Sequence, residues 1–357
     1  MSSVTLQQIA DEAGVTRGQV SRVLNGRYKE NRPAVARKAQ RIRDIAEGLG
    51  YRPNVAARSV TKGSFGQVAF VTCGDLGFDW FAPELLHGVH ESVEQDGQRL
   101  VIAEMSAQQM LEPDNMPRLF RESSVDGLLV NLDGKLSGEV LEAFDALKLP
   151  MVLLNQKRNS RCVYPDEIAG GAAAVRHLLG DGRRKIGYAC LSPQAKEPHY
   201  SRFDRLQGFW EALGEAELEP AFVLDGDPRY QGKLGNGDAI LGELIDRHPD
   251  LDAVVCYGTN EALAVVLAAA KRGIELPGRL RVVAFDHQVS HARTGVPVDT
   301  MVVPFKKVGT MGVQLLREMV RENSAQRPPR QRIAYQQLYV ADTQEMRTPG
   351  GAGEGKR

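Results

Sequence analysis

Residues 5–26 read TLQQIADEAGVTRGQVSRVLNG, and this stretch decides how the amino-terminal part of the chain folds. Apolar residues recur in its first half at i, i+3, i+4 and i+7, which is the spacing of one face of an amphipathic helix. These residues are Leu6, Ile9, Ala10 and Ala13. In the second half, Val20, Val23 and Leu24 are spaced to pack inward. The stretch therefore predicts two short helices that share one small core.

Residues that begin and end helices stand at the matching positions. Thr5 and Gln8 have the spacing of a capping box, and Thr16 and Gln19 repeat it at the start of the second helix. Gly14 lies between the two helices, where a positive φ costs a glycine little. The pattern predicts a helix-turn-helix, the shape that many DNA-reading proteins use.

The outward face of the second helix carries short and cationic residues. They are Arg17, Gly18, Ser21 and Arg22. Such a face suits the base edges and phosphates of a DNA major groove. The alternative interpretation is an ordinary helical hairpin inside a core.

A third helix and a linker follow. We expect the helix over residues 33–49, with Gly50 ending it. In the linker, Asn54 can cap a helix made of VAARSV, residues 55–60. A helix of two turns is unstable alone in water, so it should fold only when it docks on a partner. A plain linker is the alternative.

The overall charge is zero, but the two parts of the chain differ. Residues 1–62 contain twelve Lys or Arg and five Asp or Glu, a net charge of +7. The rest contains 33 basic and 40 acidic residues, a net charge of −7. A small basic head on an acidic body favours a polyanionic partner for the head, whereas a solvated basic face is the bland alternative.

The motifs VTLQQIADEAGV, VSRVLNG and LGYRPNVAARSV together resemble the headpiece of the lactose-repressor (LacI/GalR) family of bacterial transcription regulators. The resemblance extends from Val4 to about residue 343. It implies that residues 55–60 form a hinge helix that pairs in the DNA minor groove, with Val60 as the wedge. The DNA-contacting residues that it implies are Thr5, Thr16, Arg17, Gly18, Ser21, Arg22, Asn25, Asn54, Ala57, Arg58 and Val60.

One insertion departs from the family spacing. The run RYKENR, residues 27–32, makes the connection to the third helix a few residues longer than usual. It either adds a phosphate contact or is only a longer loop, and the loop is the slightly favoured interpretation.

From Gly66 onward, short apolar runs alternate with amphipathic segments. Strands are predicted at 67–71, 99–103, 127–131, 151–155, 185–191, 221–225, 253–257 and 281–285. Helices are suggested between them, for example at 85–97, 173–182, 205–216 and 260–273. This alternation predicts an α/β body with parallel sheets covered by helices on both faces.

The fold class expected for the whole chain is α/β, with an all-helical headpiece and a two-lobed, periplasmic-binding-protein-like body that has two parallel sheets. The predicted domains are a headpiece (1–50), a hinge and linker (51–65), the body (66–345) and a disordered, glycine-rich tail (346–357). Lobe 1 is expected at 66–165 and 296–326, and lobe 2 at 166–295 and 327–345.

In open parallel sheets, ligands bind beyond the carboxyl ends of the strands. Residues there that match the family's ligand positions are Asp75, Trp80, Phe81, Asn155, Asp166, Arg205, Tyr257, Asn260 and Asp286. An arginine offers a rigid fork of donors to hydroxyl pairs or carboxylates. His287 stands where the family has a second aspartate, and Val302 and Val303 stand near a usual glutamine. Each residue could instead make a lobe-closing or surface contact.

Several classes of function find no support in the sequence. The four cysteines form no CxxC pair and are expected to be buried thiols of a reducing cytosol. No secretory signal, membrane-length apolar run, dinucleotide-binding motif or nucleophile elbow is recognised. We therefore predict no enzyme, no cofactor and no metal site.

The expected protein is a cytoplasmic, nucleoid-associated homodimer that binds a near-palindromic DNA operator, with no membrane partner. A small effector, carbohydrate by resemblance, would bind between the lobes and control operator affinity. The protein is expected to be a repressor. The alternatives are a solute-binding protein for transport, which leaves residues 1–62 idle, and a sugar-modifying α/β enzyme, for which no catalytic constellation is recognised.

Overall fold

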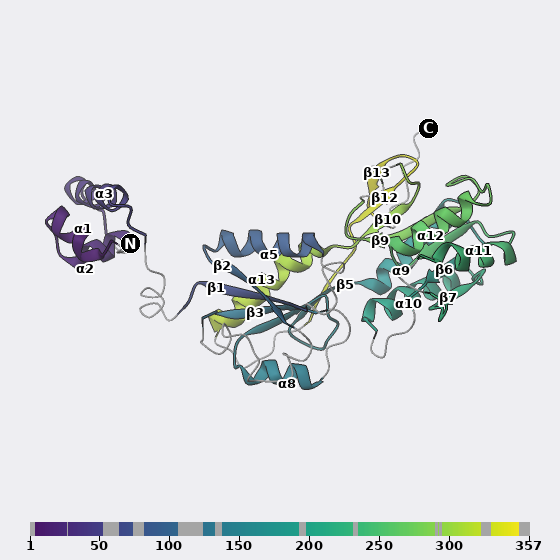
Figure 1. Ribbon diagram of the computed structural model, residues 1–357, viewed down its shortest axis with the longest axis horizontal. Helices are drawn as coiled ribbons and strands as arrows, with labels where there is room; N and C mark the ends of the chain where they lie inside the picture. Colours follow the sequence, from purple (N-terminus) through teal and green to yellow (C-terminus); the bar gives the residue numbers. More distant parts are fainter. Residues whose placement is uncertain are drawn as a thin grey trace. The chain divides into compact units, whose positions relative to one another are not determined.

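The computed structural model describes residues 4–26, 28–52, 64–73, 82–105, 124–132, 138–192, 198–230, 235–289, 292, 295–322 and 330–349. The chain separates into two compact units, residues 1–65 and residues 66–357 (Figure 1). Each unit has its own hydrophobic core.

Three helices form the first unit. They are α1 (Leu6–Ala13), α2 (Arg17–Leu24) and α3 (Pro33–Gly48). Their shared core contains the apolar residues that the sequence placed inward, led by Ile9, Val20 and Ile42, all of which are buried. The two-helix pattern and the third helix are therefore confirmed, with α3 ending one residue before the predicted position.

The predicted caps and turns of this unit are present. Both capping boxes form, since the Thr5 and Thr16 hydroxyls each accept from the backbone N–H three residues later at 3.3 Å. Gly14 has φ 66° and Gly50 has φ 68°, the left-handed region that favours glycine. The Tyr51 N–H donates to the Ala46 carbonyl at 2.8 Å, which closes the end of α3.

The second unit contains two sheets, which define two lobes. Lobe 1 has a parallel six-stranded sheet in the order β11-β5-β4-β3-β1-β2. Its strands are β1 (Gln67–Cys73), β2 (Arg99–Met105), β3 (Gly127–Asn131), β4 (Met151–Leu154), β5 (Cys162–Pro165) and β11 (Gln331–Ile333).

Helices cover both faces of the lobe 1 sheet. On one face, α5 (Pro83–Gln95) and α13 (Phe305–Glu322) pack side by side, and their apolar residues share a core with Phe70 and Leu129 (Figure 1). On the other face, α8 (Gly138–Ala146) buries Phe144 against the sheet. Segments far apart in the sequence, α5 and α13, thus build one layer.

Lobe 2 has a seven-stranded sheet in the order β13-β12-β10-β9-β8-β6-β7. Its strands are β6 (Ile186–Cys190), β7 (Val223–Asp225), β8 (Ala253–Cys256), β9 (Arg281–Asp286), β10 (Asp299–Val302), β12 (Gln337–Val340) and β13 (Glu345–Arg347). The strands β12 and β13 run antiparallel to their neighbours. This sheet is therefore mixed, which corrects the expectation that both sheets are parallel.

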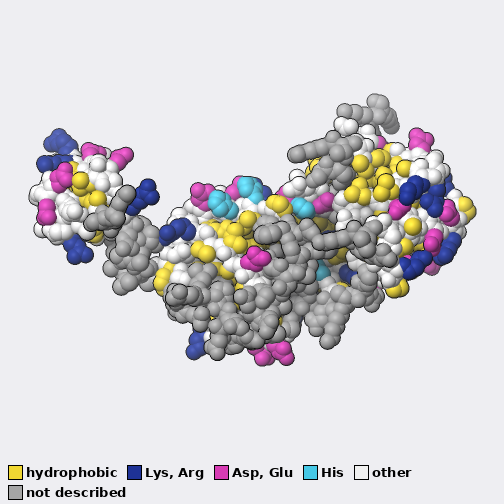
Figure 2. Space-filling view, in the orientation of Figure 1, with side chains coloured by type: hydrophobic (Ala, Val, Ile, Leu, Met, Phe, Trp, Pro, Cys, Tyr) yellow, Lys and Arg dark blue, Asp and Glu magenta, His cyan; other side chains and the backbone are white. Residues whose placement is uncertain are grey.

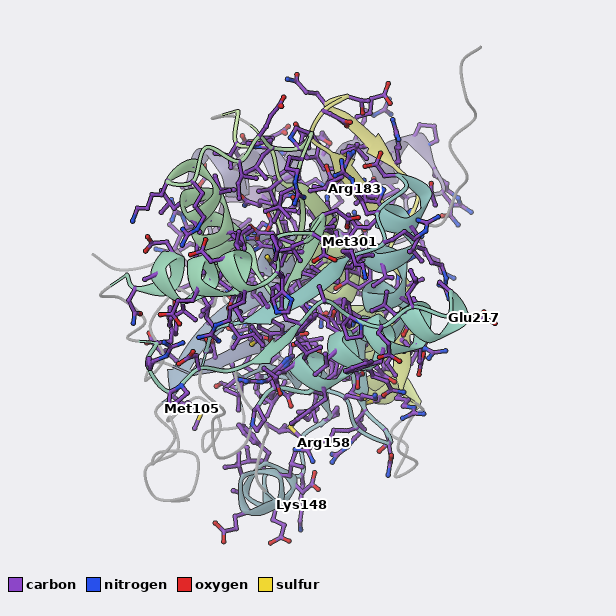
Figure 3. The ribbon with its side chains drawn as sticks, turned by 90° about the vertical axis from the view of Figure 1, so that its right-hand side faces the viewer. Met105, Lys148, Arg158, Arg183, Glu217 and Met301 are labelled. Atoms are coloured by element: carbon purple, nitrogen blue, oxygen red, sulfur yellow. The ribbon has the colours of Figure 1, made fainter. Side chains whose placement is uncertain are left out.

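Four helices cover lobe 2. They are α9 (Glu167–Gly180), α10 (Tyr200–Glu215), α11 (Gly237–Arg247) and α12 (Thr259–Ala270). The helices α9 and α10 share one face of the sheet with Met301, which is fully buried and is labelled in Figure 3. The helices α11 and α12 cover the opposite face.

All eight predicted strands are present, but two predicted crossovers between the lobes were misplaced. The chain returns to lobe 1 only after β10, because β10 pairs with β9, whereas the sequence placed that return at residue 296. It re-enters lobe 2 only after β11, because β11 pairs with β5, whereas the sequence placed that crossing at residue 327. The first crossover falls between β5 and α9, near the predicted residue 165.

The expectation of disorder from residue 346 is wrong for Met346 and Arg347. Both lie in β13, which pairs with β12 in an antiparallel register. Residues 350–357 lie outside the described residues.

The described cysteines Cys162, Cys190 and Cys256 are buried free thiols, as the sequence predicted. Burial raises the pKa of Cys190 to about 12, so this thiol is chemically quiet. Within the described ranges, no helix is long and apolar enough to cross a membrane, and no three His, Cys, Asp or Glu side chains group as they would around a metal ion.

Candidate DNA interface and effector site

The start of α2 is held rigidly by its own sequence. The Gln19 N–H donates to the Thr16 hydroxyl, and the Thr16 N–H donates back to the Gln19 side-chain oxygen at 3.2 Å. The helix buries Val20 and Val23 on its inner face. Its outer face is thereby fixed relative to the core of the first unit.

That outer face is open. Arg17, Gly18 and Arg22 are exposed, and a Cβ built at Gly18 would meet no atom within 4 Å. The Arg22 Nε donates to the Gly18 carbonyl at 3.3 Å, and the Asn25 amide donates to the Ser21 hydroxyl at 3.2 Å. The absence of bulk at Gly18 would let the helix approach another surface closely.

The inserted loop is attached to α3. Glu30 forms an ion pair with Arg43, which neutralises one cation of this unit. Other Lys and Arg side chains project from the unit in Figure 2. The exposed cations on α3 include Arg37, Lys38 and Arg41. The loop thus makes a structural contact with α3, and its interpretation as a longer connection stays a prediction.

Seven predicted site residues lie outside the described residues. Four belong to the hinge, and three follow β1. They are Asn54, Ala57, Arg58, Val60, Asp75, Trp80 and Phe81.

In the second unit, the carboxyl end of β4 meets the start of α10. Asn155 has φ 56°, and its carbonyl accepts a hydrogen bond from His199 Nε2 at 2.7 Å. Its side-chain oxygen accepts from the Tyr200 hydroxyl at 3.3 Å. Since β4 belongs to lobe 1 and α10 to lobe 2, these hydrogen bonds join the lobes.

The contact continues as a directed chain of hydrogen bonds. A carbonyl only accepts, so His199 carries its proton on Nε2, and in the neutral ring Nδ1 accepts. The Ser201 hydroxyl, 2.8 Å from Nδ1, therefore donates to His199. The Tyr257 hydroxyl, 2.8 Å from Ser201, in turn donates to Ser201. Asn155 and Tyr257, both predicted site residues, are thus connected across the lobes.

Arg205 is buried and has several partners. Its Nε and Nη2 donate to the two carboxylate oxygens of Glu167 at 2.7 and 2.9 Å, and its Nη1 donates to the Tyr257 carbonyl at 2.7 Å. The guanidinium carbon also lies 4.3 Å from the centre of the Phe285 ring. Burial alone would lower the pKa of Arg205, but Glu167 raises it well above its ordinary range.

Asp286 lies at the carboxyl end of β9. Its oxygens accept from the Thr259 hydroxyl at 2.5 Å and from the His287 N–H at 2.6 Å. Burial raises the pKa of Asp286, but the hydrogen bonds from His287 and Thr259 lower it more, so the net shift is downward. The carboxylate is therefore charged near neutral pH and suits a ligand hydroxyl.

The remaining predicted residues occupy helix starts. Asp166 caps α9 by accepting from the Ala169 N–H at 3.3 Å, and it forms an ion pair with Arg332 at 3.1 Å. Asn260 is exposed in the first turn of α12. The structure thus brings Asn155, Arg205 and Tyr257 into one connected network, while Asp166 and Asn260 have the contacts of capping and surface residues.

Comparisons with known proteins match both units of the chain. The family model described as "Bacterial regulatory proteins, lacI family" matches residues 5–54, and the "Periplasmic binding protein-like domain" model matches residues 175–341. The chain belongs to the lacI family of bacterial regulatory proteins. It is a DNA-binding transcription regulator, and the members of its family are regulators rather than enzymes.

Relatives of this lacI-family regulator match over most of their length. The transcriptional regulator GalR of Escherichia coli (strain K12) is 27% identical over 319 residues, which cover 87% of this chain and 88% of GalR. The transcriptional repressor PurR of Aliivibrio salmonicida is 25% identical over 331 residues, which cover 90% of this chain and 94% of PurR.

Solved structures give the same fold. The lac repressor dimer bound to operator and the anti-inducer ONPF has a TM-score of 0.72 at 17% identity, with 98% of this chain and 99% of that chain covered. The CelR–cellobiose complex has a TM-score of 0.61 at 25% identity, with 97% and 100% covered.

Sequence reasoning missed several residues of this network in the lacI-family body. Glu167, Ser201 and Thr259 contact predicted site residues, and Tyr335 contacts Glu167, yet none was singled out. His199 lies just before the segment SRFDRLQGF, so its place ahead of the recognised Arg205 is the one signal that could have drawn attention to it. The partners of Arg205 come from other elements, which no local pattern reveals.

Proposed function

We propose that this regulator is a repressor whose affinity for operator DNA is set by a small carbohydrate ligand. The ligand would bind where the carboxyl ends of the strands of the two lobes face each other. The observation that carries the DNA half of the proposal is the outer face of α2, which is rigidly capped, open and cationic. We place the protein in the cytoplasm on the nucleoid, where its operator is.

The DNA contacts follow from that face. Arg17 and Arg22 supply guanidinium donors that match guanine edges and phosphates, and Gly18 permits close approach of the backbone. The proposed contact set also includes Thr5, Thr16, Ser21 and Asn25 on the described helices. The hinge residues Asn54, Ala57, Arg58 and Val60 complete the proposal from sequence resemblance.

The ligand half rests on polar groups at the strand ends. Asp286 is a fixed carboxylate acceptor, and Tyr257 and Asn155 belong to the hydrogen-bond chain between lobes. Acceptors and donors of this kind suit hydroxyl groups of a sugar. The relative named as a complex with cellobiose supports the carbohydrate class. Arg205 would contact the ligand only through N–H groups beyond those bound by Glu167 and Tyr257.

We also propose a homodimer. Leu263 and Leu267 lie one turn apart on α12 and are exposed, and Ile102 is exposed on β2, which ends the strand order of lobe 1. Exposed apolar side chains on both lobes favour burial against a second copy. A dimer presents two α2 helices, which predicts a near-palindromic operator. Light scattering of Leu267→Lys should show a shift toward monomer.

The direct test is selection of DNA duplexes from a random pool by the purified full chain. We expect an enriched near-palindromic sequence, and we expect a sugar found by thermal-shift screening to change its affinity. Recovery of no preferred sequence would contradict the proposal.

One variant, with a matched control, tests the DNA half of the proposal by itself. Arg22→Ala should reduce discrimination between the selected operator and single-base variants by about 1–3 kcal/mol, while ligand binding is kept. The matched control is Arg247→Ala, an exposed arginine of lobe 2, which should leave DNA binding unchanged. Unaltered base preference in Arg22→Ala would remove this residue from the reading face.

A further inference from the structure

A second set of contacts joins the lobes, away from the Asn155 chain. Glu84 lies in the first turn of α5 in lobe 1, and His287 and Gln288 follow β9 in lobe 2. The Gln288 amide donates to Glu84 Oε1 at 2.5 Å, and His287 Nε2 lies 3.8 Å from Glu84 Oε2. Glu84 Oε2 is buried and makes no hydrogen bond to any described residue. The imidazole is thus its nearest ionic partner among them.

The other ring nitrogen of His287 faces a second carboxylate. Nδ1 lies 2.9 Å from Asp286 Oδ1, and Asp286 is itself held by Thr259 from α12. The imidazole therefore lies between a carboxylate of lobe 2 and a carboxylate of lobe 1. A neutral imidazole has one N–H and no charge, whereas the imidazolium donates to Asp286 and at 3.8 Å also forms an ion pair with Glu84.

The described surroundings of His287 favour its charged form. Asp286 is the last residue of β9, Glu84 comes from α5, Thr259 comes from α12, and the Phe305 ring of α13 lies 6.5 Å away. The neighbouring cation, Lys306, is paired with Glu91 at 2.9 Å. The charged groups that contact the imidazole in the described residues are thus both acidic.

We propose that His287 is a proton-operated latch that holds lobe 1 and lobe 2 together through Glu84. When protonated, it binds Asp286 and Glu84 at once. When neutral, it keeps its bond to Asp286 and leaves the half-buried Glu84 carboxylate without a counter-ion for its buried Oε2, which favours separation of the lobes. Because the proposed function makes lobe arrangement control operator affinity, the proton would act as a second effector, and this last step rests on that function.

The pH window follows from the direction of the shift. The hydrogen bond to Asp286 raises the pKa of His287 above its ordinary value, against an opposing effect of burial and with help from the charges of Asp286 and Glu84. The latch is therefore complete below about pH 6.5 and is lost as the pH rises through the raised pKa.

The test measures the distance between the lobes without DNA or sugar. Spin labels are placed through an unnatural amino acid at Glu142 on α8 and at Glu219 beyond α10, both exposed, so that the native thiols stay untouched. Electron–electron resonance then gives the distance distribution at about pH 6 and about pH 8.5. We expect a distribution that shifts toward longer distances at the higher pH.

Three variants and one control make the result specific. His287→Gln, which is never charged, should show the long-distance distribution at both pH values, and His287→Lys should show the short one at both. Glu84→Gln should remove the pH response. His90→Gln, an exposed histidine elsewhere on α5, is the matched control and should behave like the unmodified chain.

Two outcomes would overturn the latch. One is a distribution in the unmodified chain that does not change with pH, and the other is a pH response that persists in His287→Gln. Thermal unfolding of each variant verifies that it is folded. Since this measurement needs neither operator nor ligand, a failed latch is distinguishable from a failed regulatory function, which the DNA selection tests separately.

Discussion

Arg205 and Glu167 form a buried two-point ion pair that ties α10 to the first residue of α9. The Tyr335 hydroxyl donates to the same carboxylate at 2.6 Å, from the segment that crosses from β11 to β12. Together with Tyr335, the ion pair therefore fixes two of the three points where the chain passes between lobes, namely β5 to α9 and β11 to β12. The proposed ligand arginine is also a structural residue.

Removal of Arg205 alone should destabilise lobe 2. Arg205→Ala leaves the Glu167 carboxylate buried without its partner, which costs about 3–5 kcal/mol of unfolding free energy. Urea denaturation measures this change. The double variant Arg205→Met with Glu167→Leu removes both charges and should recover most of the loss. Arg272→Ala, which breaks an exposed ion pair with Asp246, is the control. If Arg205→Ala has the same urea midpoint of unfolding as the unmodified chain, the structural role of Arg205 is refuted.

The helices α9 and α10 approach closely because glycines face each other. A Cβ at Gly208 would lie 2.0 Å from the Ile168 carbonyl oxygen, and a Cβ at Gly171 would lie 2.2 Å from the Arg205 carbonyl oxygen. Gly208→Ala should therefore lower the unfolding free energy by about 1–3 kcal/mol or more.

Gly214→Ala is the matched control for Gly208→Ala, because it lies on the same helix with no atom within 4 Å of the added Cβ. Alanine has the higher helix propensity, so this control should be neutral or slightly stabilising. Equal unfolding midpoints for the two variants would show that Gly208 is not needed for the close approach of the helices.

Acid stability should depend on Asp299. This carboxylate lies 2.7 Å from His177 Nε2 and 2.7 Å from Arg281 Nε, and it accepts from the Ala341 N–H at 2.8 Å. Burial raises the pKa of Asp299, but hydrogen bonds from His177 and Arg281 lower it more, so the folded-state pKa is depressed.

A depressed carboxylate pKa contributes stability that is present above the unfolded pKa of about 3.9 and is lost as the pH falls through the folded value. Unfolding free energies measured from about pH 6 to about pH 2 should therefore fall less steeply in Asp299→Asn than in the unmodified chain. Asp250→Asn changes an exposed aspartate and should leave the slope intact. An equal slope in Asp299→Asn would contradict the assignment.

The ligand should depend on Asp286. Asp286→Asn removes a charged acceptor at the carboxyl end of β9, and loss of a hydrogen bond to a charged group should weaken sugar binding by about 1.5–3 kcal/mol. Calorimetric titration with the sugar found by screening measures this change, and thermal unfolding without sugar verifies that the variant is folded. Sugar binding of unchanged strength would place the ligand elsewhere.

Much of the fold was predictable because its signals are local. The capping boxes at Thr5 and Thr16 and the strongly apolar strands such as residues 127–131 are visible in short windows. The strand β10 was missed because it begins with Asp299 and Thr300, polar residues that are nevertheless 1% and 0% exposed. The buried Asp299 carboxylate is paired with His177 and Arg281 from other elements, and no local periodicity predicts such a pairing.

The candidate site was predictable only in part for the same reason. The motif around Arg205 located an arginine near the strand ends. It does not reveal Glu167, which accepts hydrogen bonds from the Nε and Nη2 atoms of Arg205. The latch at His287 depends on Glu84, about two hundred residues away in the chain. Pairings of this kind are products of topology, and only a structure displays them.

The most direct test of the central claim is the coupling between sugar and operator. The operator Kd is measured with and without saturating sugar, and the sugar Kd is measured with and without saturating operator, at one fixed salt concentration. Our account predicts that each ligand changes the affinity of the other by the same factor, because coupling between two sites is reciprocal. An operator Kd that stays the same when sugar is bound would contradict it.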